Sequence, residues 1–415
     1  MPKKTSLKIC ILGKYPPIEG GVSCGTYWLV RALARRGHRV FVVTNAQEAG
    51  FEYQSPLFPS DGRYLEPPNV AVINTRQLNA KFIPAYSAFT SKLAGLAIDV
   101  ITKEKIDILY SNYLLPYGVA AYLAKAATGI PWFLDHAGSD ITTLFAERQL
   151  SAVFNELFHK ADVVANTSQV RSRIGTAGFI TADKLAPRWL DKMFARDLDD
   201  SFSPRVKPLD LSRYFDDFKQ GAPVFTYLGK ISLLRKTFAF IKAAGHLPKG
   251  SFYLLFVTEQ GRNVNLLTNV LQQHGLKRHA CILPFQPPWK ISAILNASTC
   301  VVCPEDEEQP YFPKGTHGSR VPLETMMCAK CAIVGRGMSE KAFYASCKDN
   351  EHFLVVNPKD SREFGKKLKM IIDRPAAAEK IGRQAREYVL AKKSFFESTV
   401  AAFVDNLRIT VARSA

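Results

Sequence analysis

Short apolar segments recur along this chain and alternate with longer segments whose apolar residues are spaced as on one face of a helix. The short segments are rich in Val, Ile and Leu without polar alternation, which is typical of parallel strands covered on both faces. We predict strands at residues 7–12, 40–44, 106–110, 132–135, 163–166, 224–228, 252–257, 280–283, 300–303, 332–334 and 353–356. Helical patterns lie between them, including residues 27–36, 376–390 and 395–407.

This alternation is interrupted between Gly178 and Asp210, where Asp, Pro and Arg are frequent. We interpret this stretch as an irregular connection between two domains. The predicted fold class is therefore α/β, with two doubly wound, Rossmann-like parallel-sheet domains that face a cleft. We expect the first domain at residues 1–208 and the second at residues 209–390, followed by a C-terminal helix within residues 391–415 that packs back toward the first domain.

The composition is that of an ordinary globular protein. Of the 415 residues, 47% are hydrophobic and 22% are charged, which excludes disordered and collagen-like architectures. The eight cysteines are too sparse for a disulfide scaffold and fit a reducing compartment. The apolar run at residues 9–13 is too short for the core of a signal peptide, and residues 108–124 contain polar residues and a proline that disfavour a membrane span. We therefore expect a cytoplasmic protein.

The net charge of the chain is strongly positive, at +18. A protein of this charge attracts polyanions, so nucleic acid, anionic lipid and phosphorylated small molecules are candidate partners. The basic excess is spread over both halves, and the sequence contains no zinc-finger or helix-turn-helix signature. We therefore expect no specific nucleic acid partner.

Two segments of the first half place candidate site residues directly after predicted strands. Gly20 and Gly21 precede the first long helix, where glycine lets backbone N–H groups approach a phosphate or a sugar; an ordinary turn is the alternative. His136 and Asp140 follow a later strand and are candidates to orient a substrate. The alternative for this pair is helix capping by Ser139 or Asp140, with His136 packed in the loop.

The loop after the first strand of the second half carries three cations, Lys230, Arg235 and Lys236. Positive charges at this position can hold a diphosphate and stabilise it as a leaving group. A solvated basic loop without a ligand is the alternative. The glycine loop at Gly20 does not match G-x-G-x-x-G, and the chain has no P-loop pattern, so NAD-type and P-loop chemistry are disfavoured.

A second anion site is predicted where a later strand of this half leads into a helix. Ser319 or Thr316 would cap that helix. Backbone N–H groups from Ser319 to Val321, with Arg320 beside them, would then bind an anion. Glu324, which we place in the first turn, would accept hydrogen bonds from sugar hydroxyls, although a capping role is equally natural for it.

Two cysteine pairs have the spacing of zinc knuckles, at residues 300 and 303 and at residues 328 and 331. The first pair falls on a predicted strand, where residues i and i+3 face opposite sides, and the second lies in an apolar stretch. We therefore interpret these cysteines as buried and structural, and we expect no metal.

An apolar stripe runs through residues 81–100 at helical spacing. Its members are Phe82, Tyr86, Phe89, Leu93, Leu96 and Val100. Such a stripe packs on a sheet, or else it lies on a membrane or a lipid acceptor, with Arg76, Lys81 and Lys92 meeting anionic headgroups.

Taken in order, these motifs resemble those of glycosyltransferase family 4, whose members have the GT-B fold. The resemblance spans nearly the whole chain. It rests on residues 17–23, 33–44, 136–140, 161–168, 229–236 and 321–328.

The resemblance implies a retaining transfer of a sugar from a nucleotide-sugar donor, without a required metal or other cofactor. By analogy, Gly20 and Gly21 would lie near the donor phosphate and His136 near the transferred sugar. Lys230 matches the family's first basic residue, and Lys236 best matches its second, with Arg235 as the alternative.

The resemblance departs from the family pattern at one place. Glu324 matches the second glutamate of the family's E-x7-E motif, which usually contacts the ribose, but Thr316 stands in place of the first. The loop from Glu305 to His317 is longer than usual, and Arg320 suggests an altered donor pocket.

We therefore expect a glycosyltransferase with an acceptor-side first domain, to which Asp140 would contribute, and a nucleotide-sugar-binding second domain. The acceptor is open: a lipid-linked compound, a glycan or a soluble molecule. Peripheral attachment to the inner face of an anionic membrane is a further expectation. The alternatives are a sugar-phosphate or sucrose-type synthase of the same fold and a non-catalytic protein that binds nucleotide sugars or polyanions.

Overall fold

The computed structural model describes residues 6–77, 88–137, 140–141, 143–144, 147–166, 170, 184–187, 201–305 and 318–414. The chain divides into two compact units. Unit 1 comprises Met1–Arg196 and Phe395–Ala415, and unit 2 comprises Asp197–Ser394.

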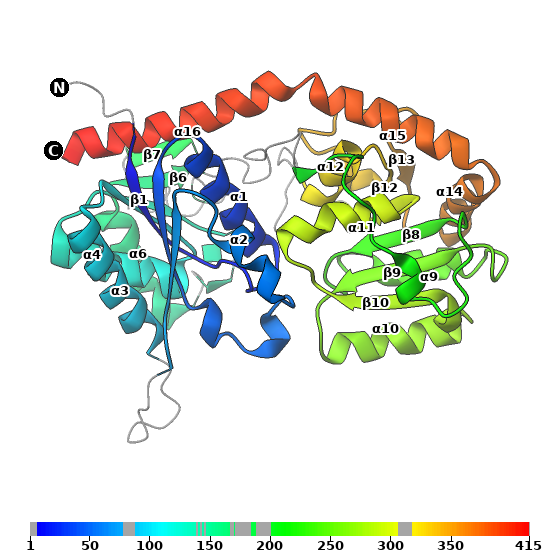
Figure 1. Ribbon diagram of the computed structural model, residues 1–415, viewed down its shortest axis with the longest axis horizontal. Coiled ribbons are helices and arrows are strands. Elements are labelled where there is room, and N and C mark those ends of the chain that lie inside the picture. Colours follow the sequence, from blue (N-terminus) through cyan, green and yellow to red (C-terminus); the bar gives the residue numbers. More distant parts are fainter. Residues whose placement is uncertain are drawn as a thin grey trace. The chain divides into compact units, whose positions relative to one another are not determined.

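Within its described residues, unit 1 has a seven-stranded parallel sheet (Figure 1) with the order β3-β2-β1-β4-β5-β6-β7. The strands are β1 Lys8–Leu12, β2 Arg39–Thr44, β3 Val70–Asn74, β4 Ile108–Asn112, β5 Trp132–Asp135, β6 Val163–Asn166 and β7 Leu185–Pro187. Ile9 of β1 is paired with Val40 of β2 on one side and with Ile108 of β4 on the other. The chain thus enters the sheet at its centre.

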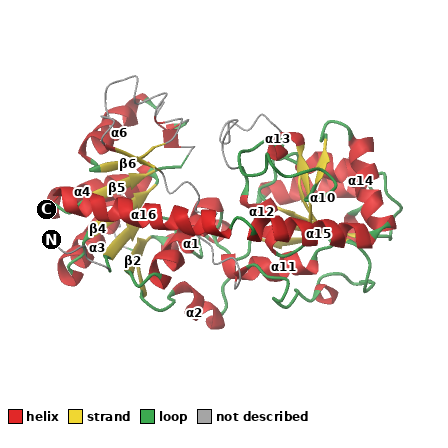
Figure 2. Cartoon of the chain, turned by 90° about the horizontal axis from the view of Figure 1, so that it is seen from above, coloured by secondary structure: helices red, strands yellow, loops and turns green. Residues whose placement is uncertain are grey.

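Helices cover both faces of this sheet. They are α1 Gly21–Arg35, α3 Phe89–Glu104, α4 Val119–Thr128, α6 Arg148–Lys160 and most of α16 Lys393–Ser414, with a short α2 at Gly62–Leu65. Apolar residues of α3, α4 and α6 form one core with alternate strand residues such as Leu12 and Trp132. On the other face, Phe403 of α16 packs against Tyr110 of β4 and Phe133 of β5, with ring centroids 5.8 and 5.7 Å apart. Figure 2 shows the course of α16 past these strands.

Unit 2 repeats this architecture with a parallel sheet of six strands among its described residues, in the order β10-β9-β8-β11-β12-β13. The strands are β8 Val224–Leu228, β9 Tyr253–Thr258, β10 Ala280–Pro284, β11 Cys300–Cys303, β12 Cys331–Gly335 and β13 Leu354–Val356. The helices are α9 Thr237–Ala244, α10 Arg262–Gln273, α11 Ile291–Ala297, α12 Arg320–Met327, α13 Arg336–Ser339, α14 Ser361–Asp373 and α15 Pro375–Leu390. The predicted α/β class with two parallel sheets is confirmed.

Two strands of unit 1 were not predicted from the sequence. Val70–Asn74 forms β3 at one edge of its sheet, and all five residues are only half-buried, so the apolar signal is weak. Leu185–Pro187 forms β7 at the other edge. The prediction of an irregular connection from Gly178 to Asp210 is therefore wrong at these three residues, because a three-residue edge strand carries too little hydrophobic pattern to be recognised.

The apolar stripe predicted at residues 81–100 packs into the core at Leu93, Leu96 and Val100. Phe82 and Tyr86 lie outside the described residues, and α3 begins at Phe89. Leu93 and Val100 are buried against the sheet, so their alternative role on a membrane surface is wrong. Within the described part of the chain, no helix combines the length and apolar character needed to cross a bilayer.

Candidate active site

In unit 2, a hydrogen-bonded loop joins β8 to α9 at the carboxyl end of the sheet. The hydroxyl of Tyr227 donates to the carbonyl oxygen of Lys230 over 2.7 Å, and Thr237 Oγ1 donates to Tyr227 Oη over 2.9 Å. Both carboxylate oxygens of Glu259 accept from the N–H of Ile231, at 3.1 and 3.0 Å. Burial raises the pKa of Tyr227, which keeps its phenol protonated as a donor. The loop is therefore preformed.

Among the three predicted cations, Arg235 is engaged by a buried carboxylate of the same unit. Its Nη1 forms an ion pair with Oε1 of Glu305, whose side chain is 6% exposed and follows β11. This carboxylate raises the pKa of the Arg235 guanidinium. The second oxygen of Glu305 is buried and has no hydrogen-bond partner among the described residues. The protein itself therefore neutralises the charge of Arg235.

The other two cations, Lys230 and Lys236, are available to a ligand. Lys230 is exposed, and Lys236 is half-buried at the position before α9 with a φ of 55°, a left-handed conformation that is uncommon for residues other than glycine. In the part of the chain that the structure describes, neither ammonium group forms an ion pair or a hydrogen bond. The loop between β8 and α9 thus carries two positive charges, those of Lys230 and Lys236, that no described residue neutralises.

The start of α12 lies at the same end of this sheet, after β11. Ser319 occupies the N-cap position without a side-chain capping bond, and its N–H donates to Met338 Sδ over 3.3 Å. The Ser319 N–H is thus engaged by a weak acceptor, and the anion contact of residues 319–321 stays a prediction. Arg320 is half-buried and Val321 is buried at the first two helical positions.

Glu324 is buried on α12, at 3% exposure, but it is the fifth residue of the helix. The prediction that it lies in the first turn is wrong, because the helix begins only at Arg320. Its distance from the N-terminus disfavours a capping role. Thr316, the predicted departure from the family pattern, lies outside the described residues.

In unit 1, Gly20 has a positive φ, a backbone conformation that favours glycine. It precedes α1 with a φ of 98°, a conformation that strains L side chains, and a Cβ atom there would meet nothing within 4 Å. Gly21 is exposed as the first residue of α1. The helix has no side-chain N-cap. A side chain at Gly20 would therefore be strained, which explains glycine at this position, while the predicted approach of a phosphate stays a prediction.

The segment after β5 in unit 1 is held by buried carboxylates. Asp135 Oδ2 accepts from the hydroxyl of Tyr110 over 2.5 Å. Asp140 Oδ2 accepts from the N–H groups of Ala137 and Leu114, at 2.8 and 3.2 Å. His136 is fully buried, and its Nδ1 lies 3.2 Å from the carbonyl oxygen of Ala137. Asp140 therefore shapes the loop that carries His136, while their predicted contacts with substrate remain predictions.

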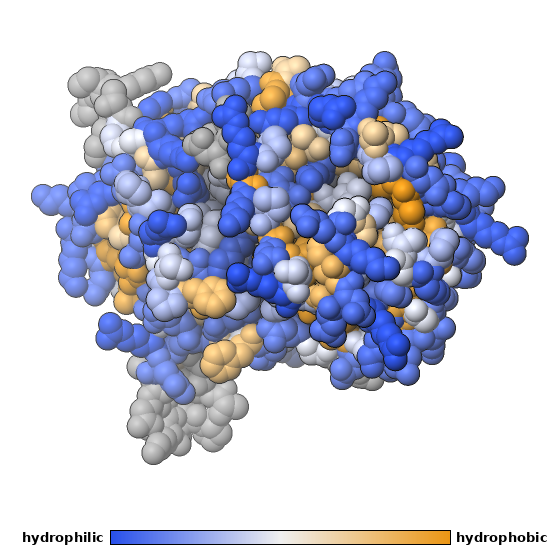
Figure 3. Space-filling model, turned by 45° about the vertical axis from the view of Figure 1, so that its right-hand side comes forward, coloured by the Kyte–Doolittle hydropathy of each residue, from blue (hydrophilic) through white to orange (hydrophobic). Residues whose placement is uncertain are grey.

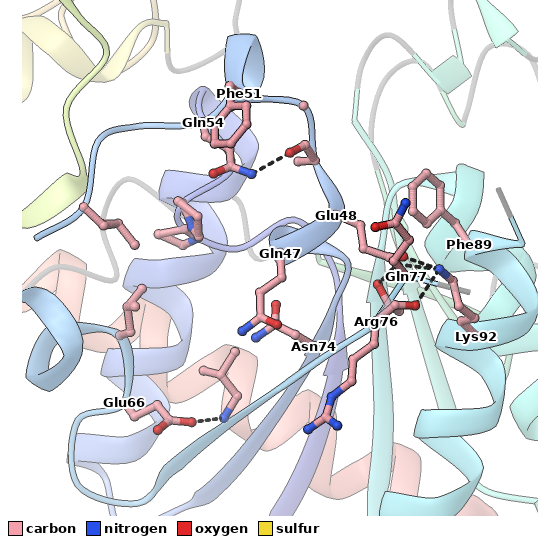
Figure 4. Close-up of a pocket in the computed structure, with 18 of the residues that line it drawn as sticks. Gln47, Glu48, Phe51, Gln54, Glu66, Asn74, Arg76, Gln77, Phe89 and Lys92 are labelled. Carbon is pink, nitrogen blue, oxygen red and sulfur yellow. Dashed lines mark hydrogen bonds and ion pairs between the residues drawn. The ribbon is translucent and has the colours of Figure 1, made fainter. Parts of the chain in front are cut away.

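Unit 1 also contains a cavity of about 1060 Å³ that the sequence analysis did not foresee (Figure 4). Its walls come from the segment after β2, the end of β3 and the start of α3. The lining includes Gln47, Glu48, Phe51, Gln54, Glu66, Asn74, Arg76, Gln77, Phe89 and Lys92. Most of these residues are polar, and they come from separate segments without periodic spacing, so no sequence motif identifies the cavity.

The four cysteines with knuckle spacing are buried, as predicted, and form no disulfide. Cys300 and Cys331 are register partners on β11 and β12, and burial raises the pKa of the Cys300 thiol. Across the described ranges, no group of three or more His, Cys, Asp or Glu side chains could hold a metal ion. The knuckle-like spacing of these cysteines therefore reflects their burial in the core.

Two family models match this chain, one in each half. The model described as "Glycosyl transferase 4-like domain" matches residues 20–187, and "Glycosyl transferases group 1" matches residues 213–388. A 157-residue segment is 28% identical to the N-acetyl-α-D-glucosaminyl L-malate synthase of Bacillus anthracis. That match spans 37% of this chain and 37% of the length of the curated relative.

Solved structures of similar fold cover nearly the whole chain. A sucrose-phosphate synthase from Thermosynechococcus elongatus has a TM-score of 0.65 at 17% identity, covering 98% of this chain and 100% of that one. HepE from Anabaena, solved in complex with UDP and glucose, has a TM-score of 0.64 at 15% identity, covering 97% and 99%. The fold is therefore that of the GT-B glycosyltransferases. The chain belongs to glycosyltransferase family 4.

Proposed function

We propose that this protein transfers a hexosyl group from a nucleotide sugar to an acceptor with retention of the anomeric configuration. The observation that carries the proposal is the pair of lysines, Lys230 and Lys236, whose charges are unneutralised within the described residues on a preformed loop of unit 2. Such a loop suits a diphosphate, the leaving group of a nucleotide-sugar donor. The similarity to HepE, solved with UDP and glucose, supports this donor class.

In the proposed reaction, the bond between the anomeric carbon and the diphosphate oxygen breaks, and the acceptor oxygen bonds to the same face of that carbon. The acceptor proton passes to the departing diphosphate, so the protein needs no dedicated base. Lys230 and Lys236 stabilise the negative charge that develops on the leaving group. Two lysines therefore take the role that a metal ion would otherwise fill, and we propose turnover without metal.

The remaining site residues position the donor in this proposal. Glu324 accepts from the ribose hydroxyls, and the backbone at Gly20 and Gly21 approaches the phosphate. His136 contacts the transferred sugar through its imidazole. Arg235 acts differently from the lysines: because Glu305 holds it, we assign it to the architecture of the loop.

Electrostatic attraction to an anionic membrane is the second part of the proposal. The net charge of +18 favours it, with about 1 kcal/mol for each cation near such a surface. The stripe on α3 does not support it, because Leu93 is buried and Lys92 pairs with Glu48. The face drawn in Figure 3 is largely hydrophilic, with apolar residues interspersed. Salt-sensitive co-sedimentation with anionic vesicles is expected; protein left in the supernatant at low salt would contradict it.

The phosphate site is tested with Lys230→Ala combined with Lys236→Ala. Wild-type protein should be stabilised against heat by UDP-, GDP- or ADP-sugars, and a ligand at 100 times its Kd contributes about 2.7 kcal/mol. The double variant should lose this stabilisation and nucleotide release in the presence of acceptor. Lys242→Ala, an exposed lysine at the end of α9, is the matched control. Turnover of the wild-type protein should be unchanged by a metal chelator. Near-normal turnover of the double variant would show that this loop does not bind the donor.

A further inference from the structure

The cavity of unit 1 lies at the carboxyl end of its sheet, where its lining includes Asn74, the last residue of β3, and residues of the segment after β2. Its volume, about 1060 Å³, slightly exceeds the about 300–1,000 Å³ typical of small-molecule sites. All its lining residues fall between Pro16 and Lys92, so the cavity is built by unit 1 alone. It has room for a ligand of substantial size.

Of the four charged side chains that line this cavity, Lys92 and Glu48 form an ion pair, and Glu66 and Arg76 carry opposite charges, so the lining has no net charge. Lys92 Nζ donates to both carboxylate oxygens of Glu48, at 2.5 and 2.6 Å, and to the carbonyl oxygen of Arg76 over 3.0 Å. The hydroxyl of Thr75 donates to the same carboxylate. Glu66 accepts from the Val72 N–H over 2.7 Å. The lining therefore favours an uncharged polar ligand over a multiply charged anion.

Side-chain amides provide the uncommitted hydrogen-bonding groups of the cavity. Gln54 is engaged, because its Nε2 donates to the carbonyl oxygens of Ala46 and Ala49. Gln47, Gln77 and Asn74 form no side-chain hydrogen bond within the described residues, and the Oδ1 of Asn74 is buried. A buried acceptor without a donor costs about 1–3 kcal/mol, which a ligand hydroxyl would recover. Amides both donate and accept, as sugar hydroxyls do.

Two aromatic rings complete the lining. Phe51 is 88% exposed on the 3-10 helix Phe51–Tyr53, and Phe89 is half-buried at the start of α3. Figure 4 shows the ring of Phe51 above the amides of Gln47 and Asn74, and the ring of Phe89 to their right. An exposed ring at a polar cavity offers an apolar face to the C–H side of a pyranose ring.

We infer that this cavity binds the acceptor, and that the acceptor presents a saccharide to it. Phe51 stacks on a sugar ring, while Asn74 and Gln47 exchange hydrogen bonds with its hydroxyls. This inference rests on the proposed function and narrows its acceptor to a glycan or a glycosylated molecule. A small anionic acceptor would instead depend on Arg76, whose exposed guanidinium forms no hydrogen bond among the described residues.

The test is saturation-transfer difference NMR on the full-length protein with methyl glycosides of glucose, galactose, mannose and N-acetylglucosamine, and with L-malate as the anionic probe. At least one glycoside should bind, and Phe51→Ala should weaken it tenfold or more. Tyr53→Ala is the matched control, since Tyr53 is also exposed, at 57%, on the same short helix but does not line the cavity. Asn74→Leu should also weaken binding, with an unchanged melting temperature as the check on folding.

Three results would overturn the inference: no glycoside binds, binding survives Phe51→Ala, or L-malate binds and is lost in Arg76→Ala. Nucleotide binding, measured on the same preparation, keeps the proposed function separate. If nucleotide sugars do not stabilise the wild-type protein, the proposed function is rejected. If nucleotide sugars bind but no glycoside does, only the inference about the acceptor is rejected. Glycoside binding should persist in the Lys230→Ala, Lys236→Ala variant, which places it outside the donor site.

Discussion

Replacing Arg235 by alanine should destabilise unit 2 strongly, although Arg235 lies on a surface loop. The substitution leaves the carboxylate of Glu305 without its counter-charge at a place where its side chain is only 6% exposed. Removing one partner of a buried ion pair costs about 3–5 kcal/mol, because the remaining charge stays desolvated. The expected loss of stability therefore comes from the broken ion pair and not from a change in the loop.

The expected magnitude is smaller than that range for a physical reason. The side chain of Arg235 is 28% exposed, so water already screens the pair from one side. We expect a loss of about 2–3 kcal/mol. In a domain of this size each kcal/mol corresponds to about 2–4 °C, so the melting temperature of unit 2 should fall by about 4–12 °C.

The assay is differential scanning calorimetry, because a chain of two units can melt in more than one step. Arg213→Ala is the matched control: Arg213 pairs with Asp210 in the same unit, over 3.1 Å, but their side chains are 77% and 54% exposed. That variant should change stability by less than about 0.5 kcal/mol. Arg235→Met combined with Glu305→Leu should recover most of the loss, since it removes both charges. Equal effects of Arg235→Ala and Arg213→Ala would refute the reasoning.

Three further outcomes are expected. His136→Ala should lower kcat about tenfold to a thousandfold with little change in nucleotide affinity, if the imidazole binds the sugar in the transition state; an unchanged rate would make it a packed residue. Burial lowers the pKa of His38 below its ordinary 6.5, with Arg408 and Arg36 acting in the same direction. The unfolded chain therefore binds this proton more readily, so stability is lost as the pH falls below about 6.5, and His38→Asn should reduce the drop in melting temperature between about pH 7.5 and 5.5. Leu93→Ala should cost about 2–5 kcal/mol in thermal unfolding and leave vesicle binding unchanged, because Leu93 fills the core.

The sequence was sufficient to predict the fold where strands are central and fully apolar. Trp132–Asp135, Val163–Asn166 and Cys300–Cys303 have the predicted bounds, because strands buried on both faces consist almost entirely of apolar residues. The edge strands β3 and β7 were missed, although the edge strands β10 and β13 of the other sheet were predicted. The three residues of β7 are too few to show a hydrophobic pattern, and the five residues of β3 are only half-buried.

The position of the candidate site could be predicted from the sequence, but which of its cations is paired with a carboxylate could not. Sequence placed Lys230, Arg235 and Lys236 on one loop, yet it could not distinguish among them. That distinction depends on Glu305, which lies 70 residues from Arg235 along the chain. The cavity around Gln47 and Asn74 could not be predicted for a related reason. Its residues come from separate segments, and each residue alone is common on a protein surface.

Buried polar atoms without a hydrogen-bond partner among the described residues occur at several places, and several of the side chains that hold them lie at the carboxyl end of a strand. Asn74 and Asn112 are the last residues of β3 and β4, and Glu305 follows β11 by two residues. Each has a buried side-chain atom with no hydrogen-bond partner within the described residues. Such atoms cost about 1–3 kcal/mol apiece, which a fold selected for stability alone would avoid. In doubly wound sheets the carboxyl edge is where ligands bind, so their placement is explained if substrates supply the missing partners during turnover.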